Sequence, residues 1–101
     1  MAYNSLDIEK FCSYFHSDIL VKRLQDQVVL LEGMDSFKES YRKLFLKYPS
    51  QLCELKSRIV LNEFVLDEEM IFGREEFPDG KHVVAIYGFR NELIDRVWFA
   101  N

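Results

Sequence analysis

The sequence predicts an α+β fold in which a curved antiparallel sheet wraps around a layer of helices. In the first half of the chain apolar residues recur at helical spacing, whereas from residue 52 onward they follow the period of strands. Short turn motifs separate the later strands, which makes neighbouring strands antiparallel. The 101 residues are about enough for one ordinary domain, so we expect a single domain over residues 1–101.

The first helix is predicted to follow Asp7, whose side chain can cap it. Apolar residues at helical spacing share one face of this helix: Ile8, Phe11, Cys12 and Phe15. We expect the helix to end near residues 16–18. A hairpin should follow, with strands at 19–21 and 28–31 and a turn around 25–27.

The second helix is predicted to begin after Gly33, with Asp35 or Ser36 as its cap. It should end before Pro49, because the residue before a proline is pushed out of the helical conformation. Its apolar face consists of aromatic and leucine side chains: Phe37, Tyr41, Leu44, Phe45 and Tyr48.

Four strands are predicted in the second half of the chain: 53–66, 68–77, 81–90 and 92–100. Pro78-Asp79-Gly80 and Arg90-Asn91-Glu92 mark two of the turns. Within 59–66 and 83–89 apolar residues occupy both faces of the sheet. Because helices cover only one face, we expect a second copy of the chain to cover the other and form a homodimer.

Charge and composition exclude several classes of protein. Thirteen Lys and Arg against 17 Asp and Glu leave no broad basic surface, so we expect no nucleic-acid partner. No apolar run approaches the ~18 residues of a membrane helix and no secretory signal is present, so we expect a cytoplasmic protein that does not enter a membrane. Cys12 and Cys53 lack metal-ligand spacing, and we expect reduced thiols, no metal and no cofactor.

Motifs along the whole chain resemble a known superfamily. They are Ala2-Tyr3-Asn4-Ser5-Leu6-Asp7, Phe15-His16-Ser17-Asp18-Ile19, Glu32-Gly33-Met34-Asp35, Tyr41, Pro49 and Arg96-Val97-Trp98-Phe99. The chain resembles the SnoaL-like branch of the nuclear transport factor 2-like superfamily, the relatives of ketosteroid isomerases and polyketide cyclases. The resemblance implies a cone-shaped, cystatin-like fold, commonly a homodimer, with an apolar pocket between the concave sheet face and the helices. It also implies that most of the family's first helix is missing before Tyr3.

The catalytic positions that the resemblance implies for ketosteroid isomerases hold other residues here. The general base maps to Arg23, a permanent cation that accepts no proton. The acid of the oxyanion hole maps to Tyr87, a phenol instead of a carboxylic acid. The family's tyrosine would precede Tyr3. Ketosteroid isomerase activity is therefore not expected.

A different set of residues is predicted to line the pocket: Phe15, Arg23, Tyr41, Phe45, Arg58, Tyr87 and Trp98. Their aromatic rings would contact an apolar ligand, and a guanidinium would hold an anionic or carbonyl oxygen. The alternative is that the aromatics belong to the core or the dimer interface and that the arginines form surface ion pairs. Asp95 becomes a candidate base if it points into the pocket, and a β-bulge would decide its direction.

Two polar clusters have simpler explanations than a site. Six acids lie close together in the sequence: Asp67, Glu68, Glu69, Glu75, Glu76 and Asp79. They could receive a basic partner or a divalent cation, but a solvated hairpin edge is expected. His16 and Asp18 are expected to close the first helix instead of binding a metal.

Two functions fit these observations. The first is a small dimeric SnoaL-like domain that binds a small apolar molecule in its pocket and has no identifiable catalytic set. The alternative is a cofactor-independent isomerase, cyclase or hydrolase that acts on a small apolar carbonyl or epoxide compound, with Asp95 as the base. The missing N-terminal turns favour the first. Either the true start lies upstream, or the pocket is open, or another chain supplies the missing wall, and each of these makes water-excluded catalysis by the isolated chain less expected.

Overall fold

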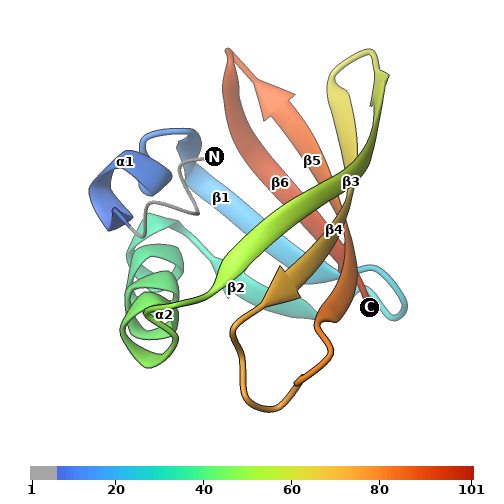
Figure 1. The fold of residues 1–101 in the computed structure, drawn as a ribbon. Helices are drawn as coiled ribbons and strands as arrows, with labels where there is room; N and C mark the ends of the chain where they lie inside the picture. The colour runs from blue at the N-terminus through green and yellow to red at the C-terminus, as the bar shows by residue number, and fades with distance from the viewer. Residues whose placement is uncertain (1–6) are drawn as a thin grey trace.

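The computed structural model describes residues 7–101, which form helices packed against a six-stranded sheet (Figure 1). The elements are, in order, α1 (Ile8–Cys12), β1 (Phe15–Arg23), β2 (Val29–Glu32), α2 (Met34–Lys47), β3 (Leu52–Leu61), β4 (Phe64–Phe72), β5 (Lys81–Arg90) and β6 (Leu93–Ala100). The strand order is β2-β1-β6-β5-β4-β3, and every neighbouring pair is antiparallel except β1 with β6. The predicted α+β fold class is confirmed.

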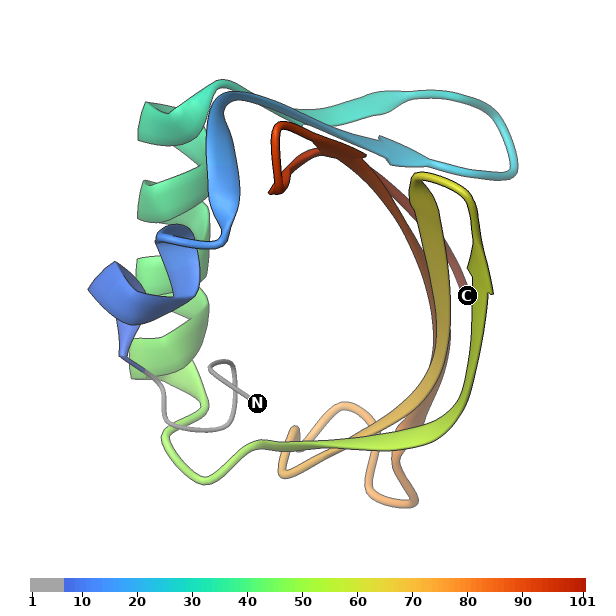
Figure 2. The same ribbon diagram turned by 90° about the horizontal axis from the view of Figure 1, so that it is seen from above.

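The sheet is strongly bent, and α1 and α2 lie on the side of its concave face (Figure 2). The register shifts within β1 after Val21, between Leu55 and Ser57 of β3, and between Gly88 and Phe89 of β5. Such shifts bend a strand and increase its twist. They allow the sheet to curve around the side chains that α2 presents.

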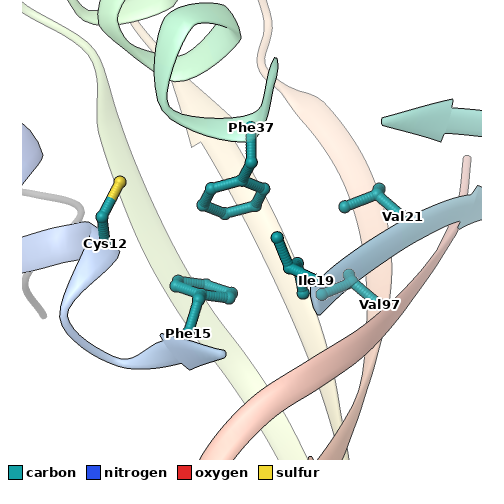
Figure 3. Close-up of a cluster of buried hydrophobic side chains, with 6 residues drawn as sticks. All are labelled: Cys12, Phe15, Ile19, Val21, Phe37 and Val97. Atoms are coloured by element: carbon teal, nitrogen blue, oxygen red, sulfur yellow. The ribbon is translucent and has the colours of Figure 1, made fainter. Parts of the chain in front are cut away.

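The largest core cluster lies where α1, β1, α2 and β6 meet (Figure 3). Its members are almost completely buried: Cys12, Phe15, Ile19, Val21, Phe37 and Val97. The Phe37 ring lies 4.6 Å from Phe15 and 4.7 Å from Tyr41, measured between ring centroids. A second cluster joins the other end of α2 to the sheet through Phe45, Cys53, Ile71 and Val83. The two clusters hold α2 against the concave face at both of its ends.

Helix α2 lies between Gly33 and the Tyr48-Pro49 pair. Gly33 precedes it with a φ of 83°, a conformation that favours glycine, and no side chain caps the helix. The predicted cap by Asp35 or Ser36 is therefore wrong. The Ser36 hydroxyl instead donates to the Glu32 carbonyl oxygen at 2.7 Å. The predicted end before Pro49 is confirmed, since the helix stops at Lys47.

The first helix is shorter than predicted. Asp7 caps it as expected, accepting a hydrogen bond from the Lys10 backbone N–H, but α1 ends at Cys12. Phe15 already lies in β1, where it is paired with Ile94 of β6. His16 and Asp18 also lie on this strand instead of closing a helix, and both contact the Arg90 guanidinium. The Tyr3-Asn4 motif lies outside the described residues.

The turn between β3 and β4 is at Asn62 and Glu63, not near residue 67 as predicted. Asn62 has a φ of 53°, close to the 52° of Asn91 in the β5–β6 turn. Both turns have the same Asn-Glu sequence. As a result Asp67 lies in the middle of β4, and the expectation of a solvated acidic edge is wrong for Asp67 and Glu69, which are buried.

The helices are short. Helix α1 has 5 residues and α2 has 14, whereas a membrane span needs about 20. No helix within residues 7–101 is therefore long and apolar enough to cross a membrane. The cytoplasmic location stays a prediction.

Candidate functional site

A cavity of about 250 Å³ lies between α2 and the concave face of the sheet. Its walls are mainly aromatic and aliphatic, and their side chains include one carboxyl group, one thiol and two phenols. From the helical side and β1 they include Phe11, Phe15, Phe37, Tyr41 and Leu44. From the sheet they include Cys53, Glu69, Ile71, Val83, Tyr87, Val97 and Phe99. Arg74 and Lys81 lie at a partly exposed end of the cavity, here named the basic end.

Strand alternation explains which sheet residues face the cavity. Glu69 and Ile71 are two residues apart on β4, so they share a face. Glu69 is paired across the sheet with Val83, and Ile71 with Lys81. These four positions therefore form one contiguous part of the concave wall.

Glu69 is the main polar group in this wall. It is only 4% exposed, and its Oε2 atom has no hydrogen-bond partner among residues 7–101. Burial, followed by the nearby Asp67 carboxylate, raises the pKa of Glu69 from 4.5 to about 7. The Cys53 thiol and the Arg58 charge oppose this shift. Glu69 can thus be protonated or ionised near neutral pH, with one oxygen available to a ligand.

Two further groups beside Glu69 remain protonated at neutral pH. Burial, and then the Glu69 carboxyl, raises the pKa of Cys53 to about 12. Burial likewise raises the pKa of the Tyr87 phenol well above its ordinary value. A protonated thiol is a poor nucleophile, so Cys53 is not a reactive cysteine. Tyr87 keeps its O–H donor.

The Asp67 carboxylate forms an ion pair with Arg58 on the neighbouring strand. The Arg58 Nε and Nη2 atoms donate to its two carboxylate oxygens at 2.7 and 2.9 Å. Asp67 is 3% exposed, whereas about half of the Arg58 side chain reaches solvent. The pair lies on β3 and β4 beside the cavity, and neither residue lines it.

Three of the seven predicted pocket residues line the cavity: Phe15, Tyr41 and Tyr87. Phe45 lies in the neighbouring core cluster. Arg23 is at the end of β1, where its Nε atom pairs with exposed Asp26 at 3.0 Å. Arg58 is bound to Asp67, as described above. Trp98 follows Val97, which lines the cavity, so it points to the convex face, where it packs against Phe64.

Asp95 does not line the cavity. Gly88 pairs with Arg96 and Phe89 with Ile94, so Asp95 is the extra residue of a β-bulge. Its carboxylate contacts the Nε atoms of Arg96 and Arg90 at 2.9 and 3.4 Å. The bulge turns Asp95 away from the face that Val97 and Phe99 share, and the inward orientation that a base would need is not found.

Sequence reasoning missed Glu69 as a cavity residue. Asp67, Glu69 and Ile71 belong to one strand only when the β3–β4 turn is placed at Asn62. With the turn near residue 67, the sequence does not show that Glu69 and Ile71 share the concave face. The repeated Asn-Glu dipeptide was the available signal. As to metals, no group of three or more His, Cys, Asp or Glu within residues 7–101 is placed to hold one.

No model of a protein family matches this chain, and no curated protein matches it. Solved structures do match. An uncharacterised cystatin-fold protein from Novosphingobium aromaticivorans is 25% identical, with a TM-score of 0.87 over 99% of this chain and 89% of that one. A SnoaL-like protein of unknown function from Burkholderia thailandensis is 11% identical, with a TM-score of 0.82 over 98% and 84%. A candidate polyketide cyclase from Sinorhizobium meliloti is 14% identical, with a TM-score of 0.82 over 98% and 86%.

Proposed function

Because this chain has the nuclear transport factor 2-like, cystatin-like fold of the SnoaL-like proteins, we propose that it binds a small, largely apolar molecule in its cavity. One observation carries the proposal: an aromatic-lined cavity contains a buried carboxyl group whose Oε2 atom has no partner among residues 7–101. Leaving such a group unsatisfied costs about 1–3 kcal/mol. A ligand that hydrogen-bonds to Glu69 offsets that cost.

The size and polarity of the cavity restrict the ligand. At about 250 Å³ it is smaller than the roughly 300–1,000 Å³ typical of sites for drug-sized molecules. The aromatic side chains favour a flat apolar body, for instance one or two fused rings. Glu69 and Tyr87 add hydrogen-bonding groups for a single oxygen or nitrogen atom.

Calorimetric titration with 1-naphthylacetamide, a neutral aromatic probe, tests the proposal. We expect saturable one-to-one binding to the wild type and loss of binding in Val83→Phe, whose larger ring fills the cavity. Val84→Phe is the matched control, because Val84 alternates with Val83 and points away from the cavity. Circular dichroism checks that both variants fold. Equal binding to all three proteins contradicts the proposal, as does absence of binding both for this probe and for its charged analogue 1-naphthylacetate.

We also propose that two copies of the chain associate through the convex face of the sheet. A convex patch of apolar residues spans β3 to β6: Ile59, Leu61, Phe64, Leu66, Ile86 and Trp98. Ile59 and Leu61 are 62% and 60% exposed. Glu68 lies at one end of this patch and Arg96 at the other, so a twofold axis along the intervening row of Leu66, Ile86 and Trp98 would bring Arg96 towards the partner's Glu68.

Sedimentation velocity at micromolar concentration tests this association. We expect a dimer for the wild type and a monomer for Ile59→Lys, which places a charge in the convex patch. Leu46→Lys is the control, because Leu46 is 69% exposed on α2, away from the patch. A wild-type species of 12.1 kDa contradicts the proposed dimer.

Glu69 favours a second candidate function, acid–base catalysis without a cofactor on a small apolar carbonyl or epoxide compound. A carboxyl group with a pKa of about 7 can both donate and accept a proton near neutral pH. Incubation with styrene oxide and with a β,γ-unsaturated ketone, followed by product analysis, tests it. We expect turnover that Glu69→Gln abolishes. No product, or equal product from the variant, contradicts catalysis by Glu69.

A further inference from the structure

Two cations lie together at the basic end of the cavity. Lys81 begins β5 on the same face as Val83 and Tyr87, and Arg74 follows β4 in the connecting loop. Burial, and then the Arg74 charge, lowers the pKa of Lys81. Burial and the neighbouring Arg74 charge thus both disfavour the charged form of Lys81, and an anion beside Lys81 would offset this.

Lys81 differs in its contacts from four of the six other lysines of the chain. Lys38, Lys43, Lys47 and Lys56 each pair with a glutamate: Glu9, Glu39, Glu76 and Glu54, respectively. Lys81 makes no ion pair with any Asp or Glu of residues 7–101. Its Nζ atom lies 5.0 Å from the centre of the Phe77 ring. The ammonium group is thus held at the cavity wall without a carboxylate partner from the described chain.

Arg74 is held in a fixed orientation beside Lys81. Its Nε and Nη2 atoms donate to the Gln51 Oε1 atom at 3.2 and 3.1 Å, and the guanidinium lies 5.5 Å from the centre of the Tyr48 ring. A guanidinium that is already ordered loses little entropy when it binds an anion. The basic end is therefore organised before any ligand arrives.

The rest of the cavity has the opposite character. Away from Lys81 and Arg74 the wall is mainly apolar and includes Ile71, Val83, Val97, Phe99 and the rings from α1, α2 and β1. Its other polar groups are Glu69, the Cys53 thiol, the Tyr87 phenol and Asn101. Glu69 is the carboxyl group in this wall, and a bound anion would further favour its neutral, protonated form. The cavity is thus apolar in its interior and cationic at one end.

We propose that the ligand is an amphipathic organic acid, whose single carboxylate binds Lys81 and Arg74 at the basic end and whose aromatic or aliphatic body fills the cavity. This inference rests on the proposed ligand-binding function and specifies the chemical class of the ligand. The carboxylate supplies the negative charge that Lys81 lacks among the described residues. The apolar body accounts for the aromatic walls.

Titration with a matched pair of probes, 1-naphthylacetate and 1-naphthylacetamide, tests the charge requirement. The two have nearly the same shape and differ in charge. We expect the wild type to bind the acid at least about tenfold more tightly than the amide, because a charge-assisted hydrogen bond contributes a difference in binding free energy of that size. Lys81→Met should abolish this preference and Lys81→Arg should keep it. Lys43→Met, at an exposed position of α2, should leave it unchanged.

The outcomes separate the two proposals. Equal affinities of the wild type for acid and amide, or an unchanged preference in Lys81→Met, overturn the organic-acid inference while the cavity-binding function stands. An equal loss of preference in Lys43→Met also overturns it, because general electrostatic attraction would then explain the result. Absence of binding by both probes overturns both proposals. Circular dichroism on each variant confirms that the fold is intact.

Discussion

Replacing Glu69 with Gln should change how the stability of the protein depends on pH. Gln has nearly the shape of a protonated glutamic acid and still accepts a hydrogen bond from the Cys53 thiol, but it does not ionise. Near pH 4.5 the wild type and the variant should therefore be almost equally stable. As the pH rises, Glu69 loses its proton in the unfolded wild-type chain, whereas in the folded protein it must either keep the proton or ionise while buried. Both lower the free energy of unfolding of the wild type, and neither occurs in the variant.

The expected size of the effect follows from the pKa. The pKa of Glu69 rises from 4.5 in the unfolded chain to about 7 in the folded protein. The folded state thus binds more protons than the unfolded state between these values, and the free energy of unfolding falls as the pH rises through this window. At about 1.36 kcal/mol for each pKa unit, the wild type should lose about 3 kcal/mol that the variant keeps.

Urea denaturation of both proteins at a series of pH values from below 4.5 to above 7 measures this difference. The other titratable groups near Glu69 are Asp67, Cys53, Arg58 and Tyr87, and they are present in both proteins. The difference between the two curves therefore isolates Glu69. It should be near zero at the acidic end and reach its full value above pH 7.

A difference that does not vary with pH would contradict the raised pKa of Glu69. It would mean that Glu69 titrates at its ordinary pKa, so that water or a rearranged side chain satisfies the carboxylate. A difference that grows toward acidic pH would have the wrong sign, since it would require the folded state to favour the ionised form.

Three further predictions concern the core and the residues around the cavity. Phe37→Ala should lower the free energy of unfolding, measured by urea denaturation, by about 3–5 kcal/mol, because removing a fully buried ring leaves a cavity. Phe77→Ala, at an exposed position, should have a much smaller effect. Arg58→Met should cost about 1.5–3 kcal/mol, because it leaves buried Asp67 without its partner. In the same assay Arg23→Met, whose partner Asp26 is exposed, should have no measurable effect, and equal losses would contradict this assignment. Cys12 and Cys53 should react with a disulfide reagent at least about tenfold more slowly in the folded protein than in urea. The reason is that both thiols are buried and have raised pKa values. Equal reaction rates in the two states would contradict their burial.

The parts of the fold that depend on local chemistry were predictable from the sequence. Gly33 and Pro49 bracket the second helix, and the apolar spacing from Phe37 to Phe45 identifies its buried face. Strand periodicity and the Asn91 turn likewise locate the final hairpin. These features follow from backbone preferences of single residues and from side-chain spacing, which a sequence displays directly.

The cavity depends on features that a sequence displays poorly. Phe15 continues the helical spacing of the first helix, yet its pairing with Ile94, which is far away in the chain, places it in a strand. One extra residue in β6 turns Asp95 away from the concave face. One misplaced turn shifts the interpretation of β4 and hides the buried position of Glu69. Each depends on pairing between distant segments, and an error of one residue reverses the face of a strand.

The most direct test of the ligand-binding account is methyl NMR of the protein during titration with 1-naphthylacetamide. We expect the methyl resonances of Ile71, Val83 and Val97, which line the cavity, to shift and saturate together. The methyls of Ile59 and Leu61 on the convex patch should not move. Shifts confined to Ile59 and Leu61, or no shifts with either this probe or 1-naphthylacetate, would contradict the claim that this cavity binds a small, largely apolar molecule.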